Sequence, residues 1–454
     1  MKNLTLKNLA EACGGELRNY SNEYDNREAD SVVIDSRLVT EGGIFIATKG
    51  ERVDGHSFIE QVFSKGALGV VCEKEQPQCL KPYILVKDSF KALSDIAAYY
   101  REQLTIPVIG ITGSVGKTST KEFIAGTLAA KFKVLKTQGN LNNEIGMPLT
   151  LLSIRDEHEI AVVEMGISHF GEMSRMAKIA KPDTCVITNI GQCHLEFLKD
   201  RDGVLRAKTE MFESLNPQGA VFLNGDDDKL RTLKSPVEKP IRFFGMNDGN
   251  DIYPSEIVNK GLLGSKASIH IRTASGNGEF EDFFDADVPL PGIHMIYNAM
   301  AATGVGLEYG MTYEEIKKGI ASVKAVSGRS NIISTNDYTL IDDCYNANPV
   351  SMKAAIDLLN LANTRKVAIL GDMYELGENE KALHKEVGDY AKENGIDVLI
   401  SIGELSRNMI CADYHFDTKE EFLDLKDTIL QKGDSILIKA SHGMHLEEIL
   451  GALQ

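Results

Sequence analysis

The chain has 454 residues, a hydrophobic fraction of 43%, a charged fraction of 25% and a formal net charge of −17 at pH 7. This length predicts two or three domains, and the composition is typical of a globular protein. The negative charge argues against nucleic acid or an anionic membrane as the main partner, while an anionic substrate remains compatible with basic groups in a cleft. No apolar run reaches membrane-spanning length, the N-terminus lacks the apolar core of a secretory signal, and the seven cysteines include no C-x-x-C pair. The apolar pattern predicts neither a membrane span nor a secretory signal, and the cysteine spacing predicts reduced thiols in the cytoplasm.

Three regions of different texture follow one another. Residues 1–85 mix short predicted strands and helices around VVIDSRLVTEGGIFIATKG. Residues 86–325 predict an α/β domain with strands at PVIGIT, EIAVVEMG, DTCVITNIG and AVFLNGD, and the segments IRFFGM, ASIHIRT and FEDFFDADVPL predict an antiparallel insertion within it. Residues 326–454 alternate strands such as KVAILGD with helical patterns such as SMKAAIDLLNLA, which predicts parallel β-α-β units. The last region has no G-x-G-x-x-G fingerprint, so nothing in it favours a dinucleotide.

The segment GITGSVGKTSTKE, residues 110–122, has the features of a phosphate-binding loop. It follows an apolar, β-branched run and precedes a helical pattern, which is the context that such a loop requires. Backbone N–H groups around Gly113 and Gly116 can wrap an anion at the helix N-terminus. Lys117 can reach the β- and γ-phosphates, and the Thr118 hydroxyl can hold Mg²⁺. The strict pattern G-x-x-x-x-G-K-[ST] needs a glycine where Ile111 stands, and the alternative is an ordinary glycine turn before a surface lysine.

Three further side chains in the second region are candidates for chemistry. Glu164 ends the apolar strand of EIAVVEMG, and His194 follows the strand of DTCVITNIG. Ligands of open α/β sheets gather at the carboxyl ends of strands, so both side chains are expected near the loop. Lys208 lies in a predicted helix, where an exposed lysine is the favoured interpretation from spacing alone. The alternatives for the first two are a solvated glutamate and a structural histidine.

An ordered set of segments resembles the Mur ligase family. The segments are TGSVGKTSTKE, GNLNNEIGMPLTLL, EMGISHFGEM, NIGQCHLEFL, RAKTEMF, HMIYNAMAA, DDCYNANPVSM, GDMYELGENEKALH and KASHGM. The similarity runs from DSRLVTEGG almost to the C-terminus. LNNEIGMP, YNANP and GDMYELG are similar to the branch of the family that joins D-alanyl-D-alanine to UDP-N-acetylmuramoyl-tripeptide. The family's loop has the shorter form T-G-x-x-G-K-[ST], so Ile111 is no defect.

The resemblance implies a fold, a reaction and a cofactor. The expected fold is α/β with three domains: a UDP-substrate-binding domain (1–85), a central ATP-binding domain of the P-loop ATPase type with a mainly parallel sheet (86–325), and a Rossmann-like domain that binds D-alanyl-D-alanine (326–454). The expected reaction is ATP-dependent amide-bond synthesis through an acyl phosphate, in cytoplasmic peptidoglycan precursor synthesis. ATP and Mg²⁺, with two metal ions, are the implied cofactors. The implied partners are the two small-molecule substrates, with no nucleic acid, no membrane insertion and a monomeric chain.

The resemblance also carries site residues onto matching positions. The catalytic residues implied are Lys117, Glu164, His194 and Lys208, with Thr118, Glu164, His194 and Lys208 around metal and Lys208 carbamylated. The implied ATP-binding residues are Thr112, Gly113, Ser114, Val115, Gly116, Lys117, Thr118, Ser119, Asn298, Arg329 and Asp343, with Asp342 as the alternative to Asp343. The implied substrate-binding residues are Ser36, Arg37, Asn140, Asn142, Asn143, Tyr345, Asn346 and Asn348. From the residues alone, the amide-rich loops would be turns, Arg329 a surface arginine and Asp343 a strand-end acid.

The chain departs from the family pattern at a few positions. KASHGM has Ala440 and His442 where glycine and arginine are common, a charged KDRD replaces a small-residue turn, and Cys193 and Cys344 replace small residues. None of these is expected to touch the phosphate chemistry. The competing functions are another amide ligase of the same superfamily, a P-loop kinase and a nucleotide-dependent switch protein. Phosphate release that needs both peptide partners distinguishes a ligase from the other two classes.

Overall fold

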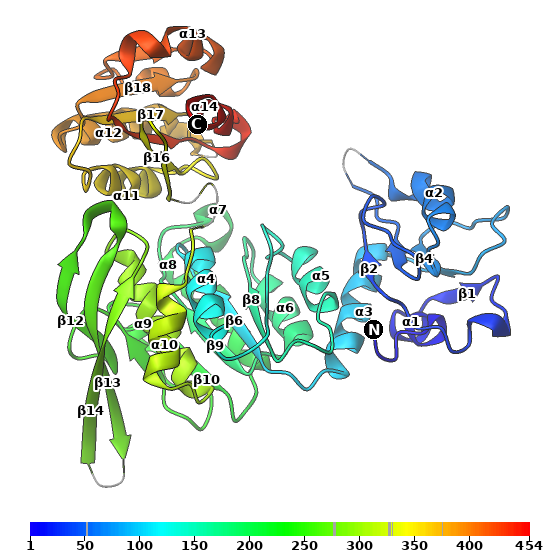
Figure 1. Cartoon of the computed structure of the whole chain (residues 1–454). Helices are drawn as coiled ribbons and strands as arrows, with labels where there is room; N and C mark the ends of the chain where they lie inside the picture. The colour runs from blue at the N-terminus through cyan, green and yellow to red at the C-terminus, as the bar shows by residue number, and fades with distance from the viewer. Residues whose placement is uncertain (51–52, 276–277, 326–327, 329, 375) are drawn as a thin grey trace. The chain divides into compact units, whose positions relative to one another are not determined.

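A computed structural model of the chain describes residues 1–454 except 51–52, 276–277, 326–327, 329 and 375. The described residues form three β-sheets, which fall in the three regions distinguished in the sequence (Figure 1). Contacts between Cα atoms group the chain into two compact units. One unit contains Met1–Ser255, Ser268–Asp285 and Tyr297–Ile320, and the other contains Glu256–Ala267, Ala286–Ile296 and Ala321–Gln454. The domain boundaries at residues 85 and 325 stay predictions.

The N-terminal sheet is mainly parallel, with the strand order β1-β5-β4-β3-β2. Only β1 runs antiparallel to its neighbour among the described strands of this sheet. The strands are Glu16–Arg18 (β1), Val32–Val33 (β2), Ile44–Ile46 (β3), Gly69–Cys72 (β4) and Tyr83–Leu85 (β5), and the helices are Leu6–Ala12 (α1), Ile59–Ser64 (α2) and Ser89–Glu102 (α3). The carboxylate of Asp88 caps α3 by accepting hydrogen bonds from the N–H groups of Phe90 and Lys91.

The central sheet has the strand order β14-β13-β12-β11-β10-β9-β6-β8-β7. Its strands are Val108–Thr112 (β6), Val134–Lys136 (β7), Ile160–Glu164 (β8), Thr184–Ile187 (β9), Ala220–Asn224 (β10), Arg242–Phe244 (β11), Ile252–Asn259 (β12), Ser265–Ser275 (β13) and Gly278–Val288 (β14). The helices are Lys117–Leu128 (α4), Gly146–Leu152 (α5), Glu172–Ala180 (α6), Leu195–Leu198 (α7), Arg201–Thr209 (α8), His294–Glu308 (α9) and Tyr313–Ala321 (α10). The strands from β7 to β12 pair in parallel, and β6, β8 and β9 are buried along their whole length. Burial on both faces explains their continuous apolar sequences.

One expectation for this region is wrong. The segment IRFFGM was predicted to begin an antiparallel insertion, but its strand β11 pairs in parallel with β10, and β12 begins in parallel with β11. The parallel sheet therefore extends through β12, and the long arm formed by β13 and β14 follows it (Figure 1). Strand orientation depends on the route of the chain between strands, which hydrophobic alternation does not encode.

The C-terminal sheet has the strand order β15-β16-β20-β17-β18-β19. Its strands are Asn331–Ser334 (β15), Thr339–Asp342 (β16), Lys366–Gly371 (β17), Val398–Ile402 (β18), Tyr414–Phe416 (β19) and Ser435–Lys439 (β20). The helices are Pro349–Leu359 (α11), Glu380–Glu393 (α12), Lys419–Ile429 (α13) and Glu447–Leu453 (α14). Apart from the antiparallel β15–β16 pair, the pairings among its described residues are parallel, as the alternating strand and helix patterns predicted.

Candidate nucleotide-binding and active site

The glycine-rich loop joins the buried strand β6 to the helix α4. Gly113 has φ +154°, and a Cβ atom there would lie 1.9 Å from the hydroxyl oxygen of Thr188. Gly116 has φ +80° and precedes the first residue of α4. Both positions therefore require glycine, one because of a close approach and the other because of its left-handed backbone. Ile111 lies inside β6 and is fully buried, so the loop is the short form.

A segment that follows β9 holds the backbone of this loop. The carbonyl oxygen of Asn189 accepts a hydrogen bond from Ser114 N–H at 3.0 Å, and its side-chain oxygen accepts one from Val115 N–H at 3.0 Å. The Thr188 hydroxyl donates to the carbonyl of Val115 at 2.6 Å, and Gly191 N–H donates to the Ser114 hydroxyl at 2.8 Å. Two loop amides expected to face phosphate are thus occupied by Asn189 in this structure. The amides at the start of α4 are the remaining anion-binding groups of the loop.

The polar side chains of the loop contact backbone and side-chain groups of the loop itself and of neighbouring segments. Lys117 Nζ donates to the Gly113 carbonyl at 3.0 Å, which places its ammonium against the loop. The Thr112 hydroxyl is buried and donates to the Met165 carbonyl at 2.8 Å, while Ser119 is half-buried on the first turn of α4. Cys193 Sγ lies 3.2 Å from the Ser114 hydroxyl. Cys193 therefore contacts a loop side chain, and the expectation that it does not touch the phosphate chemistry stays a prediction.

Glu164 and Thr118 lie in direct contact. The Thr118 hydroxyl is 3.0 and 3.1 Å from the two carboxylate oxygens of Glu164, and Asn142 donates its side-chain N–H to one of them at 2.8 Å. The contact arises because β6 and β8 are parallel neighbours in which Ile111 is paired with Glu164. Their carboxyl ends therefore share one edge of the sheet. A hydroxyl and a carboxylate beside a phosphate-binding loop are the ligand types that Mg²⁺ prefers.

Lys121 is part of this cluster and was missed in the sequence. Its side chain is 2% exposed, and its ammonium lies 3.8 Å from Glu164 and 3.1 Å from Glu122. It also donates to the carbonyl of Thr137 at 2.8 Å. A signal was present, because Lys121 follows Thr118 by three residues and therefore shares its helix face.

Lys208 is buried, so the interpretation of an exposed helical lysine is wrong. Its side chain is 1% exposed on α8, and burial together with the charge of Lys117 lowers its pKa from about 10.5 to about 8. Within the described residues, no hydrogen bond or ion pair involves its ammonium. His194 is exposed, immediately before α7, with φ +51°. No group of three or more His, Cys, Asp or Glu residues in the described chain is placed to hold a metal ion. Of the residues predicted to bind metal, Thr118 and Glu164 lie in direct contact.

Asn298 is linked to the loop helix, whereas Asp343 directly follows strand β16 of the C-terminal sheet. The Thr120 hydroxyl of α4 donates to the side-chain oxygen of Asn298 on α9 at 2.7 Å. Asp343 forms a buried ion pair with Lys439 at 2.7 Å and accepts a hydrogen bond from Ser330 N–H. The neighbouring Asp342 accepts one from Gly328 N–H. Arg329 lies outside the described residues.

The substrate-binding residues predicted in the first two regions lie in two segments, one around Ser36 and Arg37 and the other around Asn140 and Asn143. Arg37 is exposed and pairs with Asp35 at 2.7 Å, and Ser36 is buried with its carbonyl accepting a hydrogen bond from Lys65. Asn140 is exposed, while the side chain of Asn143 accepts a hydrogen bond from Gly146 N–H at 2.8 Å at the start of α5. Asn143 therefore has the turn role that its residue type favours.

In the C-terminal region, the Tyr345 ring stacks on His442 with ring centroids 5.7 Å apart. The carbonyl of Asn346 accepts a hydrogen bond from Lys439 at 2.7 Å, and Asn348 caps α11 by accepting one from Ser351 N–H. Lys439, which sequence reasoning missed, therefore connects Asp343 with the YNANP segment. The available signal was a lysine that ends an apolar strand, SILIK.

Three family models match the chain in order. They are the Mur ligase family catalytic domain at residues 28–101, the Mur ligase middle domain at residues 111–306 and the Mur ligase glutamate ligase domain at residues 328–442. The chain belongs to the Mur ligase family. The resemblance inferred from its segments and the three-domain α/β fold are thereby confirmed.

Named relatives of this Mur ligase cover nearly the whole chain. UDP-N-acetylmuramoyl-tripeptide–D-alanyl-D-alanine ligase of Bacillus subtilis is 37% identical over 98% of this chain and 97% of its own length, and the Escherichia coli enzyme of that name is 34% identical over 100% and 99%. The crystal structure of MurF from Acinetobacter baumannii has a TM-score of 0.86 at 32% identity and covers 99% of this chain and 98% of its own. MurF of Thermotoga maritima, solved in complex with ADP, has a TM-score of 0.79 at 30% identity, with coverages of 93% and 96%.

Proposed function

We propose that the protein is an ATP-dependent ligase that joins D-alanyl-D-alanine to UDP-N-acetylmuramoyl-tripeptide. The observation that carries the proposal is the contact between Thr118 and Glu164 beside the loop that ends in Lys117. Full-length relatives named for this reaction support the choice of substrates. The reaction belongs to peptidoglycan precursor synthesis, and we place it in the cytoplasm with a monomeric enzyme. No helix in the described part of the chain is long and apolar enough to cross a membrane.

The reaction brings two anions together, so the site has to balance negative charge. The tripeptide carboxylate attacks the γ-phosphorus of ATP, the bond to the β,γ-bridging oxygen breaks, and ADP leaves. The amine of D-alanyl-D-alanine then attacks the acyl phosphate carbon, loses a proton and releases phosphate. The Lys117 ammonium, which lies against the loop, supplies positive charge to the transferring phosphoryl group. The backbone amides at the start of α4 orient the phosphates.

The residues present fit a Mg²⁺ ion. Thr118 and Glu164 would hold it, since their oxygens already lie together and Asn142 donates a hydrogen bond to the same carboxylate. When bound, Mg²⁺ neutralises charge on the terminal phosphates. Lys121 balances the charge of the same carboxylate within the protein.

We further propose that Lys208 is carbamylated and, with His194, supports a second Mg²⁺. Burying an ammonium beside another cation costs free energy. Its lowered pKa of about 8 means that Lys208 is a free amine in a fraction of the molecules. The free amine attacks the carbon of CO₂ and loses a proton, which forms an N–C bond and a carbamate anion. The carbamate offers oxygen ligands, which a hard cation prefers.

The remaining predicted contacts are proposals, which are supported by the match of each residue to a motif position of the Mur ligase family. Ser36 and Arg37 would bind the UDP end, and Asn140, Asn142 and Asn143 the muramoyl or phosphate part. Asn298, Arg329 and Asp343 would contact the nucleotide, and Tyr345, Asn346 and Asn348 would help form the D-alanyl-D-alanine pocket. For Asn143 and Asn348, the structural hydrogen bonds leave only part of the amide group for a substrate.

Phosphate release tests the proposed function. The purified chain is supplied with ATP, Mg²⁺, D-alanyl-D-alanine and UDP-N-acetylmuramoyl-tripeptide, with lysine or diaminopimelate as the third residue of the peptide. The proposed ligase releases phosphate only when both peptide partners are present and forms the pentapeptide product. Hydrolysis without either partner would indicate a switch protein, and a phosphorylated product without phosphate release would indicate a kinase.

A further inference from the structure

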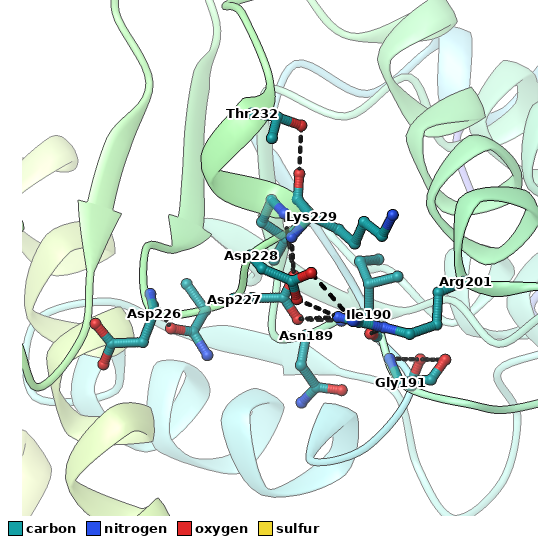
Figure 2. Close-up of polar contacts among 12 residues, drawn as sticks. Asn189, Ile190, Gly191, Arg201, Asp226, Asp227, Asp228, Lys229 and Thr232 are labelled. Carbon is teal, nitrogen blue, oxygen red and sulfur yellow. Dashed lines mark hydrogen bonds and ion pairs between the residues drawn. The ribbon is translucent and has the colours of Figure 1, made fainter.

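The peptide groups around Ile190 are held from two sides by charged side chains. Its N–H donates to the carboxylate of Asp227 at 2.7 Å, and its carbonyl accepts from Arg201 Nε at 2.8 Å (Figure 2). Arg201 also forms an ion pair with Asp228, with a second nitrogen–oxygen distance of 3.1 Å, and lies 3.9 Å from Asp227. The Asp227 side chain is only 8% exposed. Charge-assisted hydrogen bonds in such a sheltered place are stronger than neutral ones.

The residue held in this way lies between the two residues that hold the nucleotide loop. Asn189 binds the amides of Ser114 and Val115, and Gly191 donates to the Ser114 hydroxyl. A displacement of Ile190 would therefore move both of these contacts. The side chains of Arg201 and Asp227 thus act on the loop through one intervening segment.

Arg201 also connects this segment to the helix that carries Lys208. It is the first residue of α8, which Asp200 caps by accepting a hydrogen bond from Gly203 N–H at 2.8 Å. Asp202, on the same turn, pairs with Lys229 at 2.6 Å. The charged KDRD segment, which departs from the family pattern, therefore ties the start of α8 to the acidic turn formed by residues 226–228 and to Lys229. Lys208 follows Arg201 by about two helical turns.

The first residue of the acidic turn holds a third element. Asp226 accepts a hydrogen bond from the Tyr297 hydroxyl at 2.8 Å, and Tyr297 precedes Asn298 on α9. Consecutive acids of one turn thus contact α9, the Ile190 peptide and α8. Each of these elements carries or supports a residue of the proposed ATP site.

We propose that Arg201 and Asp227 are positioning residues that fix the Asn189–Gly191 segment, and through it the nucleotide-binding loop, before ATP binds. The inference rests on the proposed ATP site and adds residues that do not touch the nucleotide. The acidic turn supplies the charges that hold Arg201. The role predicts weaker nucleotide binding and faster amide exchange in the segment when Arg201 is replaced.

The test compares Arg201→Gln with a matched Arg206→Gln control on the same helix. Arg206 is exposed and lies over the ring of Phe170, 4.3 Å from its centre, and makes no described contact with the Asn189–Gly191 segment. ADP affinity is measured by calorimetry, and hydrogen exchange is measured in peptides that cover residues 188–194. Arg201→Gln should weaken ADP binding about tenfold, equivalent to about 1.4 kcal/mol, whereas Arg206→Gln should stay within about twofold of the wild type. Arg201→Lys, which keeps one charged donor, should recover part of the loss.

A folded Arg201→Gln protein with wild-type ADP affinity and wild-type exchange in residues 188–194 would overturn the proposal. If that variant does not fold, Asp228→Asn decides, because it keeps both hydrogen bonds to Ile190 and removes one of the two carboxylate charges that hold Arg201. It should weaken ADP binding in the same direction by a smaller factor, and an unchanged affinity would overturn the proposal. If the wild-type chain does not bind ADP, the proposed function fails, and the exchange measurement alone then decides whether Arg201 fixes the segment.

Discussion

The Nζ atom of Lys121 lies 3.8 Å from a carboxylate oxygen of Glu164, and both side chains are buried, with exposures of 2% and 1%. The same ammonium lies 3.1 Å from Glu122, which also pairs with Lys136. Glu164 is the proposed Mg²⁺ ligand, and its charge is therefore compensated by the protein before a metal binds. We therefore expect the stability of the fold to depend on whether the metal site is occupied.

Lys121→Met should destabilise the chain by about 3–5 kcal/mol in a metal-free buffer, because it leaves a buried carboxylate without its cation. Mg²⁺ should restore part of this loss, since the metal supplies positive charge at Glu164. Urea unfolding in EDTA and in MgCl₂ measures both effects. Lys136→Met is the control, because Lys136 pairs with Glu122 from a half-buried position and does not contact Glu164. An equal loss for Lys121→Met in both buffers would contradict the coupling.

Lys117→Ala should lower the ligation rate by about 10²–10³-fold or more, because a positioned cation is removed from the transferring phosphoryl group. The fold should remain, since Lys117 is only half-buried on the first turn of α4. Initial rates at saturating ATP give the effect, and the thermal midpoint reports the fold. Lys131→Ala, beyond the other end of α4, should retain nearly full activity. Retention of more than about a tenth of the wild-type rate by Lys117→Ala would rule out its assigned role.

Lys208 should make stability depend on pH in a defined direction. Burial, assisted by Lys117, lowers its pKa from about 10.5 to about 8, so the unfolded chain holds this proton up to a higher pH than the folded chain does. The free energy of unfolding should therefore gain a contribution from Lys208 as pH rises from about 8 to about 10.5. In CO₂-free buffer, Lys208→Met should be the more stable protein near neutral pH, and its advantage should shrink across this window.

Bicarbonate separates the carbamate from simple burial of the amine. At constant pH near 8, bicarbonate should raise the thermal midpoint of the wild-type chain and leave that of Lys208→Met unchanged. Activity of Lys208→Ala should be very low, and short carboxylic acids in solution should restore part of it. Near-normal activity of Lys208→Ala would show that the lysine has no part in the reaction.

Two ion pairs of the C-terminal sheet should differ in their contribution to stability. Lys439 and Asp343 are 3% and 13% exposed, whereas Lys432 and Asp337 are 82% and 43% exposed. Lys439→Met should cost about 3–5 kcal/mol, because it leaves a buried charge without a partner. Lys432→Met should cost about 0–1 kcal/mol, because water screens the exposed pair. Urea unfolding of both variants checks the contrast, and similar losses would contradict it. Lys439→Met should also raise KM for ATP if Asp343 contacts the nucleotide as proposed.

The sequence alone determined the local features of the site. Gly113 and Gly116 both have positive φ angles, which are a property of the loop's own backbone and favour glycine in the sequence. The apolar run of β6 and the helical spacing of α4 are likewise properties of short segments. The contact between Thr118 and Glu164 was also within reach, because strand ends in a parallel sheet meet at one edge.

Only the tertiary structure decided what surrounds these residues. The hydrogen bond between Ser114 and Gly191 joins positions 77 apart, and the one between Ile190 and Asp227 joins positions 37 apart. From spacing alone, Lys208 is expected to be exposed, because a lysine on a helix usually is. The charge of Lys117 nearby became apparent only in the fold. Hydrophobic periodicity reports which face of a segment is buried, but it does not report which distant segment covers that face. The partners of a buried charge therefore come from chain topology, which single segments do not encode.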